Sequence, residues 1–273
     1  MSARRRSRAG AWPAVLLLCA LLRPAGGQAQ ESEPAAGQAQ EPELVSDRPD
    51  FTESAATVPP GRPQLEAGYT FSRYGIGLEH ALGEILLRLP VLRRLELRLE
   101  ANSLVHQEDL PDATGLENPA VGAKLALLGP SAGREAAPVS LAILASSSVP
   151  IGSDAVAADA AEPEVRLAVS GDLGRDSGWA ANLGWAYPVE DRRLHQLLGS
   201  LAFGTTLGAR VDGYVEAYGW HHPDLEEAAT EAYLNGGITW LLTPHFQADA
   251  RLGTGLTKVA ADLFVGIGMA YRW

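Results

Sequence analysis

Charged side chains recur at alternate positions along several segments of this 273-residue chain. Residues two apart in an extended strand point to the same side. The carboxylates and guanidinium groups of such a segment would therefore share one polar environment, where they could form ion pairs. The clearest cases are Glu84/Arg88, Glu96/Arg98/Glu100, Glu164/Arg166 and Asp249/Arg251. The pattern indicates ion pairing within a wet interior.

Other residue types that carry chemistry are few. A tandem histidine pair near acids could bind a metal ion, but irregular loop clusters usually bind none, so no metal site is predicted at His221, His222, Asp224, Glu226 and Glu227. Ser146-Ser147-Ser148 lacks the glycines of a nucleophile elbow. No glycine-rich phosphate loop occurs in a strand–helix setting. We therefore predict that the chain is not an enzyme and uses no cofactor.

The elements that position the charged residues are predicted to be β-strands, because the dominant apolar period from about residue 63 onward is two. Most of these strands span about 10–13 residues, longer than is usual in soluble sheets and near the length that a tilted strand needs to cross a bilayer. About twelve are predicted, near 63–72, 77–90, 93–102, 119–128, 138–149, 163–172, 178–187, 195–207, 210–220, 230–242, 246–255 and 261–273.

The pattern predicts an all-β fold, a transmembrane antiparallel up-and-down β-barrel of about 12 strands over residues 63–273. A secreted soluble β-sandwich or lipocalin-like barrel shows the same alternation. Opposite charges on the polar face favour the membrane barrel, as do connections that alternate between short and long, with long ones at 103–118, 150–162, 188–194 and 221–229. Aromatic residues near strand ends fit an interfacial girdle, formed by Tyr69, Phe71, Tyr187, Trp220, Trp240, Phe246 and Tyr271.

A secretory signal peptide is predicted at residues 1–29, followed by a flexible polar leader at 30–46. A cationic start precedes an apolar stretch from Ala11 to Leu22, which is too short to span a bilayer. The only cysteine, Cys19, lies inside this stretch. Five of the 22 basic residues and none of the 33 acidic ones lie in the signal peptide, so the exported chain is strongly acidic and no nucleic-acid partner is expected.

Residues 47–62 form a separate N-terminal signature segment. Pro59-Pro60-Gly61 ends it with a turn before the first strand. The segment could enter the barrel as a plug, pairing Asp47, Arg48, Asp50 or Glu53 with lumen charges, or it could rest against the rim as an ordered tether. We favour insertion.

This segment carries a family resemblance. Asp47, Arg48, Pro49, Asp50, Phe51, Thr52 and Glu53, followed by Ser54, 57–61 and 64–69, resemble the N-terminal signature of a bacterial outer-membrane transporter family labelled for the meta-pathway of phenol degradation. Shorter matching pieces follow in order, among them 83–88, 149–153 and 237–244. The resemblance covers nearly all of residues 47–273. It implies transport of small, hydrophobic or aromatic, phenol-like solutes across the outer membrane of a Gram-negative bacterium.

The closing strand implies two further partners. It ends in Tyr271 and Trp273, which is similar to the terminal aromatic signal read by the outer-membrane assembly machinery, although phenylalanine is the usual last residue. The outward apolar face implies outer-membrane lipid as the surrounding partner.

The predicted lumen is narrow or partly plugged, because twelve strands lie between the filled eight-stranded barrels and the open channels of larger ones. Two interpretations of its charges remain open. They could contact a small-molecule solute, or they could hold a packed lumen together in a structural or surface barrel; a soluble periplasmic β-protein is a third, weaker alternative. The predicted lumen-lining residues are Glu66, Glu84, Arg88, Glu96, Arg98, Glu100, Lys124, Arg166, Asp212, Glu216, Asp249, Arg251 and Arg272.

Overall fold

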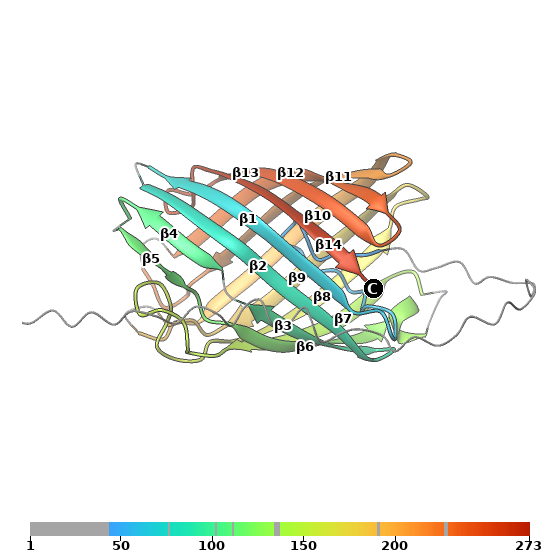
Figure 1. Ribbon diagram of the computed structural model, residues 1–273, viewed down its shortest axis with the longest axis horizontal. Helices are drawn as coiled ribbons and strands as arrows, with labels where there is room; N and C mark the ends of the chain where they lie inside the picture. The colour runs from blue at the N-terminus through green and yellow to red at the C-terminus, as the bar shows by residue number, and fades with distance from the viewer. Residues whose placement is uncertain are drawn as a thin grey trace, which may run out of the picture. The chain divides into compact units, whose positions relative to one another are not determined.

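A computed structural model describes residues 44–75, 77–101, 103–110, 112–133, 137–189, 192–226 and 229–273. The predicted signal peptide and residues 30–43 of the predicted leader lie outside the described residues. The alternating sequence forms one antiparallel sheet of 14 strand segments (Figure 1). These are β1 (Gln64–Tyr74), β2 (Gly77–Leu92), β3 (Leu95–Ala101), β4 (Leu104–Glu108), β5 (Ala113–Leu116), β6 (Ala120–Leu128), β7 (Ser140–Ser148), β8 (Pro163–Asp172), β9 (Ser177–Ala186), β10 (Gln196–Gly208), β11 (Val211–His221), β12 (Thr230–Thr243), β13 (Phe246–Gly255) and β14 (Leu263–Arg272).

The sheet closes on itself because β1 pairs with both β2 and β14. Two wall strands are interrupted. β3 and β4 both pair with β2, one after the other along its length, and β6 and β5 pair with them in turn. The 14 segments therefore make a closed barrel of 12 strands, which confirms the predicted fold class.

The prediction of a long loop at 103–118 is wrong. Most of this stretch is strand, in β4 and β5, with a tight connection between Glu108 and Ala113. The inward-facing positions shift by one residue at the break before β4, so that Ser103 and Val105 are buried where a strict period of two would place Asn102 and Leu104. This change of phase hides the strand from a search for one continuous alternation.

The apolar face of the barrel points outward. Leu183 and Ile267 are 69% and 57% exposed, whereas Arg88 and Lys124 are fully buried. A soluble β-sandwich or barrel would bury the leucines and expose the cations, so the burial pattern is that of a wall made for lipid outside and polar groups inside. In the part of the chain that the structure describes, no helix has the length and apolar character needed to cross a membrane.

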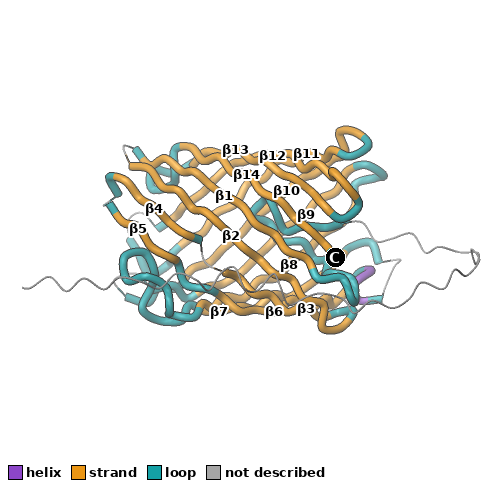
Figure 2. Tube along the Cα trace, in the orientation of Figure 1, coloured by secondary structure: helices purple, strands orange, loops and turns teal. Residues whose placement is uncertain are grey.

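Short turns and longer loops lie at opposite ends of the barrel (Figure 2). The turns after β2, β8, β10 and β12 are tight, and the connection after β6 contains a short 3₁₀-helix, η2 (Pro130–Ala132). The C-terminus lies at this short-turn end, where the Trp273 amide donates to the Pro63 carbonyl at 3.0 Å. The stretches 149–162, 187–195 and 222–229 form the longer connections at the other end.

Candidate functional site

The chain before β1 runs through the inside of the barrel. Asp47 contacts side chains of β2, β3 and β6, while the amides of Phe51 and Thr52 donate to Glu216 of β11. These strands occupy opposite sides of the closed sheet. Residues 47–58 therefore cross the lumen, and in Figure 1 this blue stretch is seen behind the near wall. We call residues 47–58 the lumen segment.

The first anchor of the lumen segment is Asp47 in a cluster of cations. Its carboxylate lies 2.6 Å from Arg98, 2.8 Å from Lys124 and 3.2 Å from Arg88. All four side chains are buried. Burial alone would raise the pKa of Asp47, but the three cations hold that pKa well below its usual range. Asp47 is therefore an anion at any physiological pH.

Wall carboxylates complete this cluster. Arg88 lies 2.9 Å from Glu96 and 3.1 Å from Glu66, and Arg98 lies 3.0 Å from Glu96. Glu53 of the lumen segment adds a contact of 2.9 Å to Arg98. Each buried charge thus has partners of opposite sign, which offsets the cost of removing it from water.

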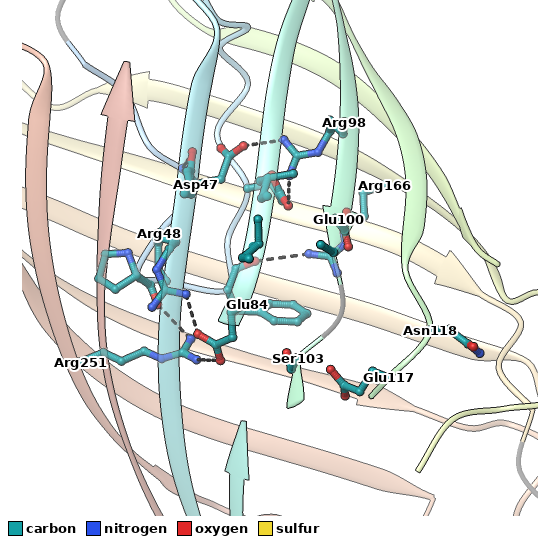
Figure 3. Close-up of a pocket in the computed structure, with 18 residues that line it drawn as sticks. Asp47, Arg48, Glu84, Arg98, Glu100, Ser103, Glu117, Asn118, Arg166 and Arg251 are labelled. Carbon is teal, nitrogen blue, oxygen red and sulfur yellow. Dashed lines mark hydrogen bonds and ion pairs between the residues drawn. The ribbon is translucent and has the colours of Figure 1, made fainter. Parts of the chain in front are cut away.

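Arg48 forms a second anchor on the seam where the barrel closes. It lies 2.6 Å from Glu84 (Figure 3) and 3.5 Å from Asp249. A Cβ atom on Gly68 of β1 or on its partner Gly268 of β14 would collide with the Arg48 guanidinium group. The two glycines make the space that this side chain needs.

The far wall holds the backbone of the lumen segment. Glu216 accepts hydrogen bonds from the Phe51 amide at 3.0 Å and the Thr52 amide at 2.6 Å. Asn182 of β9 accepts from the Glu53 amide at 2.7 Å, and its own amide donates back to the Glu53 carbonyl at 2.9 Å. These bonds satisfy backbone groups that have no strand partner. The sequence reading missed Asn182, although its position on an inward-facing phase of β9 was available as a signal.

Aromatic side chains line the inner wall beside the segment. Phe51 stacks on Tyr218 with ring centroids 4.5 Å apart, and Tyr218 stacks on Tyr233 at 4.9 Å. Trp220 and Phe264 extend the row, at 5.5 and 5.9 Å from Tyr233. We call Phe51, Tyr218, Trp220, Tyr233 and Phe264 the aromatic ladder. Guanidinium groups lie over its two ends. That of Arg166 is 4.6 Å from the centre of the Phe51 ring, and that of Arg251 is 5.5 Å from the centre of the Phe264 ring.

The placement of Trp220 corrects one sequence prediction. The sequence pattern predicts this residue in the outward aromatic girdle, yet it packs against the buried Tyr233 inside the barrel. It lies two and four residues after Tyr218 and Glu216, which face the same side of β11. Because Glu216 faces the lumen, the same alternation predicts that Trp220 faces the lumen as well.

The remaining predicted lumen residues occupy different places. Arg166 contacts Glu164 of its own strand and donates to the Phe51 carbonyl at 3.3 Å. Arg251 donates to the Pro49 carbonyl at 2.9 Å. Glu100 lines a cavity, Asp212 is exposed at the start of β11, and Arg272 is buried near the short-turn end.

The lumen segment also changes the ion pairs expected along single strands. Glu96 and Arg98 do contact each other, but Arg88 takes Asp47, Glu66 and Glu96 as partners while Glu84 takes Arg48. The inserted chain supplies the nearest partner of Glu84, whereas Arg88 lies nearest to Glu96 of the neighbouring strand.

Two of the cavities that border the lumen segment differ in their linings. One has a volume of about 400 Å³ and is lined by Phe51, Glu84, Glu100, Ser103 and Arg166 (Figure 3). The other has about 470 Å³ and opens among small wall residues near the short-turn end. The segment therefore narrows the lumen and leaves space beside it.

No metal-binding geometry is found in the described ranges, where no three His, Cys, Asp or Glu side chains converge. His221 and His222 are adjacent on an extended stretch and differ in environment. His221 is exposed and contacts Thr230, whereas His222 is buried beside Gln196. Glu227 of the predicted set lies outside the described residues.

The closing strand presents its aromatic residues outward. Tyr271 and Trp273 are 39% and 44% exposed, with their rings edge to face at 5.1 Å. The contact with the assembly machinery stays a prediction.

Solved structures with a similar fold are outer-membrane channels and porins. The outer membrane channel from Pseudomonas putida F1 aligns with a TM-score of 0.60 at 13% identity, covering 80% of this chain and 98% of that one. NanC porin aligns at 0.56 and 7% identity, covering 77% and 100%, and KdgM porin at 0.50 and 11%, covering 77% and 99%. At these identities the likeness establishes the fold alone. No curated protein matches the sequence.

The closed barrel with an apolar outside and a charged inside has the fold of outer-membrane channels and porins. More particularly, the chain belongs to the family described as "Putative MetA-pathway of phenol degradation", which matches residues 46–273.

Proposed function

We propose that the protein is an outer-membrane channel for small hydrophobic or aromatic, phenol-like solutes. The aromatic ladder is the observation that carries this proposal. Planar rings pack well against stacked or edge-on aromatic faces. Neighbouring aromatic rings would offer a solute several binding positions of similar affinity. The solute could then enter the channel, move from ring to ring and leave again. The family description, with its reference to phenol degradation, supports the same solute class.

The lumen segment acts in this proposal as a plug that narrows the path. It reaches the cation cluster on one wall and Glu216 on the other, so it is held from both sides. The chain would reach the membrane by signal-peptide export, and the assembly machinery would recognise the outward Tyr271 and Trp273. Outer-membrane lipid would then cover the exposed leucines and isoleucines.

A second candidate function is a structural or surface barrel with a blocked lumen. The buried charge cluster favours it, because Arg88, Lys124 and their carboxylate partners fill one side of the interior without leaving exposed charge. Such a barrel would show no solute flux with or without the lumen segment.

Uptake by whole cells separates the two functions. Deleting the gene should lower the initial uptake rate of phenol at micromolar concentration, while uptake of a sugar of similar mass stays unchanged. Re-expression of the protein should restore the rate. Equal phenol uptake with and without the protein would reject the channel function and leave the structural barrel.

The plug should also respond to pH through Glu53. Burial raises the pKa of this carboxyl to about 7; Arg98 and Lys124 oppose the rise, and Asp47 adds to it. The pKa of Glu53 in the docked segment is higher than the ordinary value of 4.5. Docking is therefore most stable below pH 4.5 and loses stability as the pH rises from there through about 7. The window of Asp47 is separate, because its lowered pKa costs stability only as pH falls below the ordinary 3.8.

Conductance in planar bilayers should therefore increase from about pH 5 to about pH 8. Glu53→Gln, which stays neutral throughout, should give a shallower profile, because Asp50, whose pKa burial also raises, still loses its proton as pH rises. An unchanged slope in this variant would show that another group sets the pH response.

A further inference from the structure

The cavity on the short-turn side of the lumen segment has the features of a ligand site. Its volume is about 470 Å³, enough for a single-ring molecule. Small residues make its wall, contributed by Ser140, Ser170, Gly178, Ala180, Ala202 and Gly204. Small side chains on four neighbouring strands leave room that larger ones would fill.

Tyr214 and Asp50 are two of the polar residues that line this space. Tyr214 comes from β11, and Asp50 comes from the lumen segment. Among the described residues, the Tyr214 hydroxyl is buried and has no hydrogen-bond partner. A buried hydroxyl without a partner is costly, so a ligand that supplies one gains binding free energy from it.

The charge of the cavity disfavours an anionic ligand. Asp50 and Asp172 are in its lining, and none of its described lining residues is Lys or Arg. Burial and then the nearby Glu216 raise the pKa of Asp50 well above its usual range, which favours the protonated carboxyl, an O–H donor. A carboxylate-bearing solute would meet no compensating cation here.

We propose that this cavity binds a neutral single-ring solute through its hydroxyl group, with the Tyr214 hydroxyl as hydrogen-bond partner and Asp50 as the second polar contact. The inference rests on the proposed function and adds a resting site between the lumen segment and the short-turn end. The small wall residues leave room for the ring of the solute. Tyr214 and Asp50 would form hydrogen bonds with its hydroxyl group.

Calorimetric titration of the purified barrel tests the site, with phenol, toluene and benzoate as probes. Phenol should bind more tightly than toluene, and benzoate should not compete. Tyr214→Phe keeps the ring and removes the hydroxyl, so phenol affinity should fall about fivefold to tenfold, the range for one hydrogen bond, while toluene affinity stays the same. Equal phenol affinity in the two proteins would overturn the hydroxyl contact.

Gly204→Leu tests the location. A Cβ atom at Gly204 meets nothing closer than the Gly213 carbonyl oxygen at 3.8 Å, so leucine can extend into the cavity without a backbone clash. It should abolish binding of both phenol and toluene. Gly199→Leu is the matched control, because this glycine lies on the same strand and its Cβ would have similar room, 3.7 Å from Leu183.

Heat-modifiable gel mobility confirms that each variant is a folded barrel. Binding that survives Gly204→Leu would show that phenol occupies another site. Failure of the inference is distinguishable from failure of the proposed function. Phenol uptake that depends on the protein, combined with no phenol binding by the purified barrel, would overturn only the site.

Discussion

Replacing Asp47 with alanine is expected to release the lumen segment and raise the conductance of the barrel. Asp47 is the one carboxylate of the segment within 3.2 Å of Arg88, Arg98 and Lys124 together. Its loss leaves buried cations short of one negative partner. Breaking a buried pair in this way costs about 3–5 kcal/mol, which is large compared with the hydrogen bonds that hold the segment elsewhere.

The measurement is single-channel current in planar bilayers, combined with limited proteolysis of the folded barrel. The variant should show larger or more frequent openings and new cleavage within residues 47–58. Asp47→Asn keeps the shape of the side chain and should give the same direction with a smaller change. Asp212→Ala is the matched control, because Asp212 is an exposed aspartate outside the cluster. A folded Asp47→Ala barrel with unchanged current would reject the plug.

Much of the wall could be predicted from the sequence because one constraint governs it. A strand between lipid and a polar lumen must alternate, and no other arrangement satisfies both sides. Leu183 next to Asn182 shows this directly, one residue being 69% and the other 1% exposed. The alternation changes phase at the break between β3 and β4, so β4 could not be predicted from a continuous period of two.

The partners inside the lumen could not be predicted from local spacing. Arg48 meets Asp249 across about 200 positions of chain, in a space that exists only because Gly68 and Gly268 pair where the barrel closes. That seam is a property of the whole sheet. Alternation identifies which residues face inward, but the inserted segment decides which inward residues meet.

The ladder and the anchors occupy different parts of the interior, which permits separate tests. The cation cluster lies on β2, β3 and β6, whereas Tyr218, Tyr233 and Phe264 lie on β11, β12 and β14. Phe51 alone belongs to both the segment and the ladder. A change in Tyr218 therefore affects the aromatic path and leaves the ion pairs of Asp47 intact.

Tyr218→Leu is expected to slow the passage of aromatic solutes selectively. Leucine keeps an apolar side chain, but it removes the ring that stacks on both Phe51 and Tyr233. Aromatic pairs are worth about 0.5–1.5 kcal/mol beyond the area they bury, so uptake of single-ring aromatics should fall about twofold to tenfold. Uptake of an aliphatic alcohol of similar size should change little, because it gains little from a stacked ring.

The initial uptake rates of phenol and of a branched pentanol are measured in the same cells. The ratio of the two rates reports the selectivity for aromatic solutes. Phe203→Leu is the matched control, since Phe203 is an aromatic residue that is 46% exposed on the outer face of β10. It should leave the ratio unchanged. If Tyr218→Leu slowed both solutes equally, the row of rings would be packing that sets the width of the path, and the selectivity for aromatic solutes would have to come from elsewhere in the lumen.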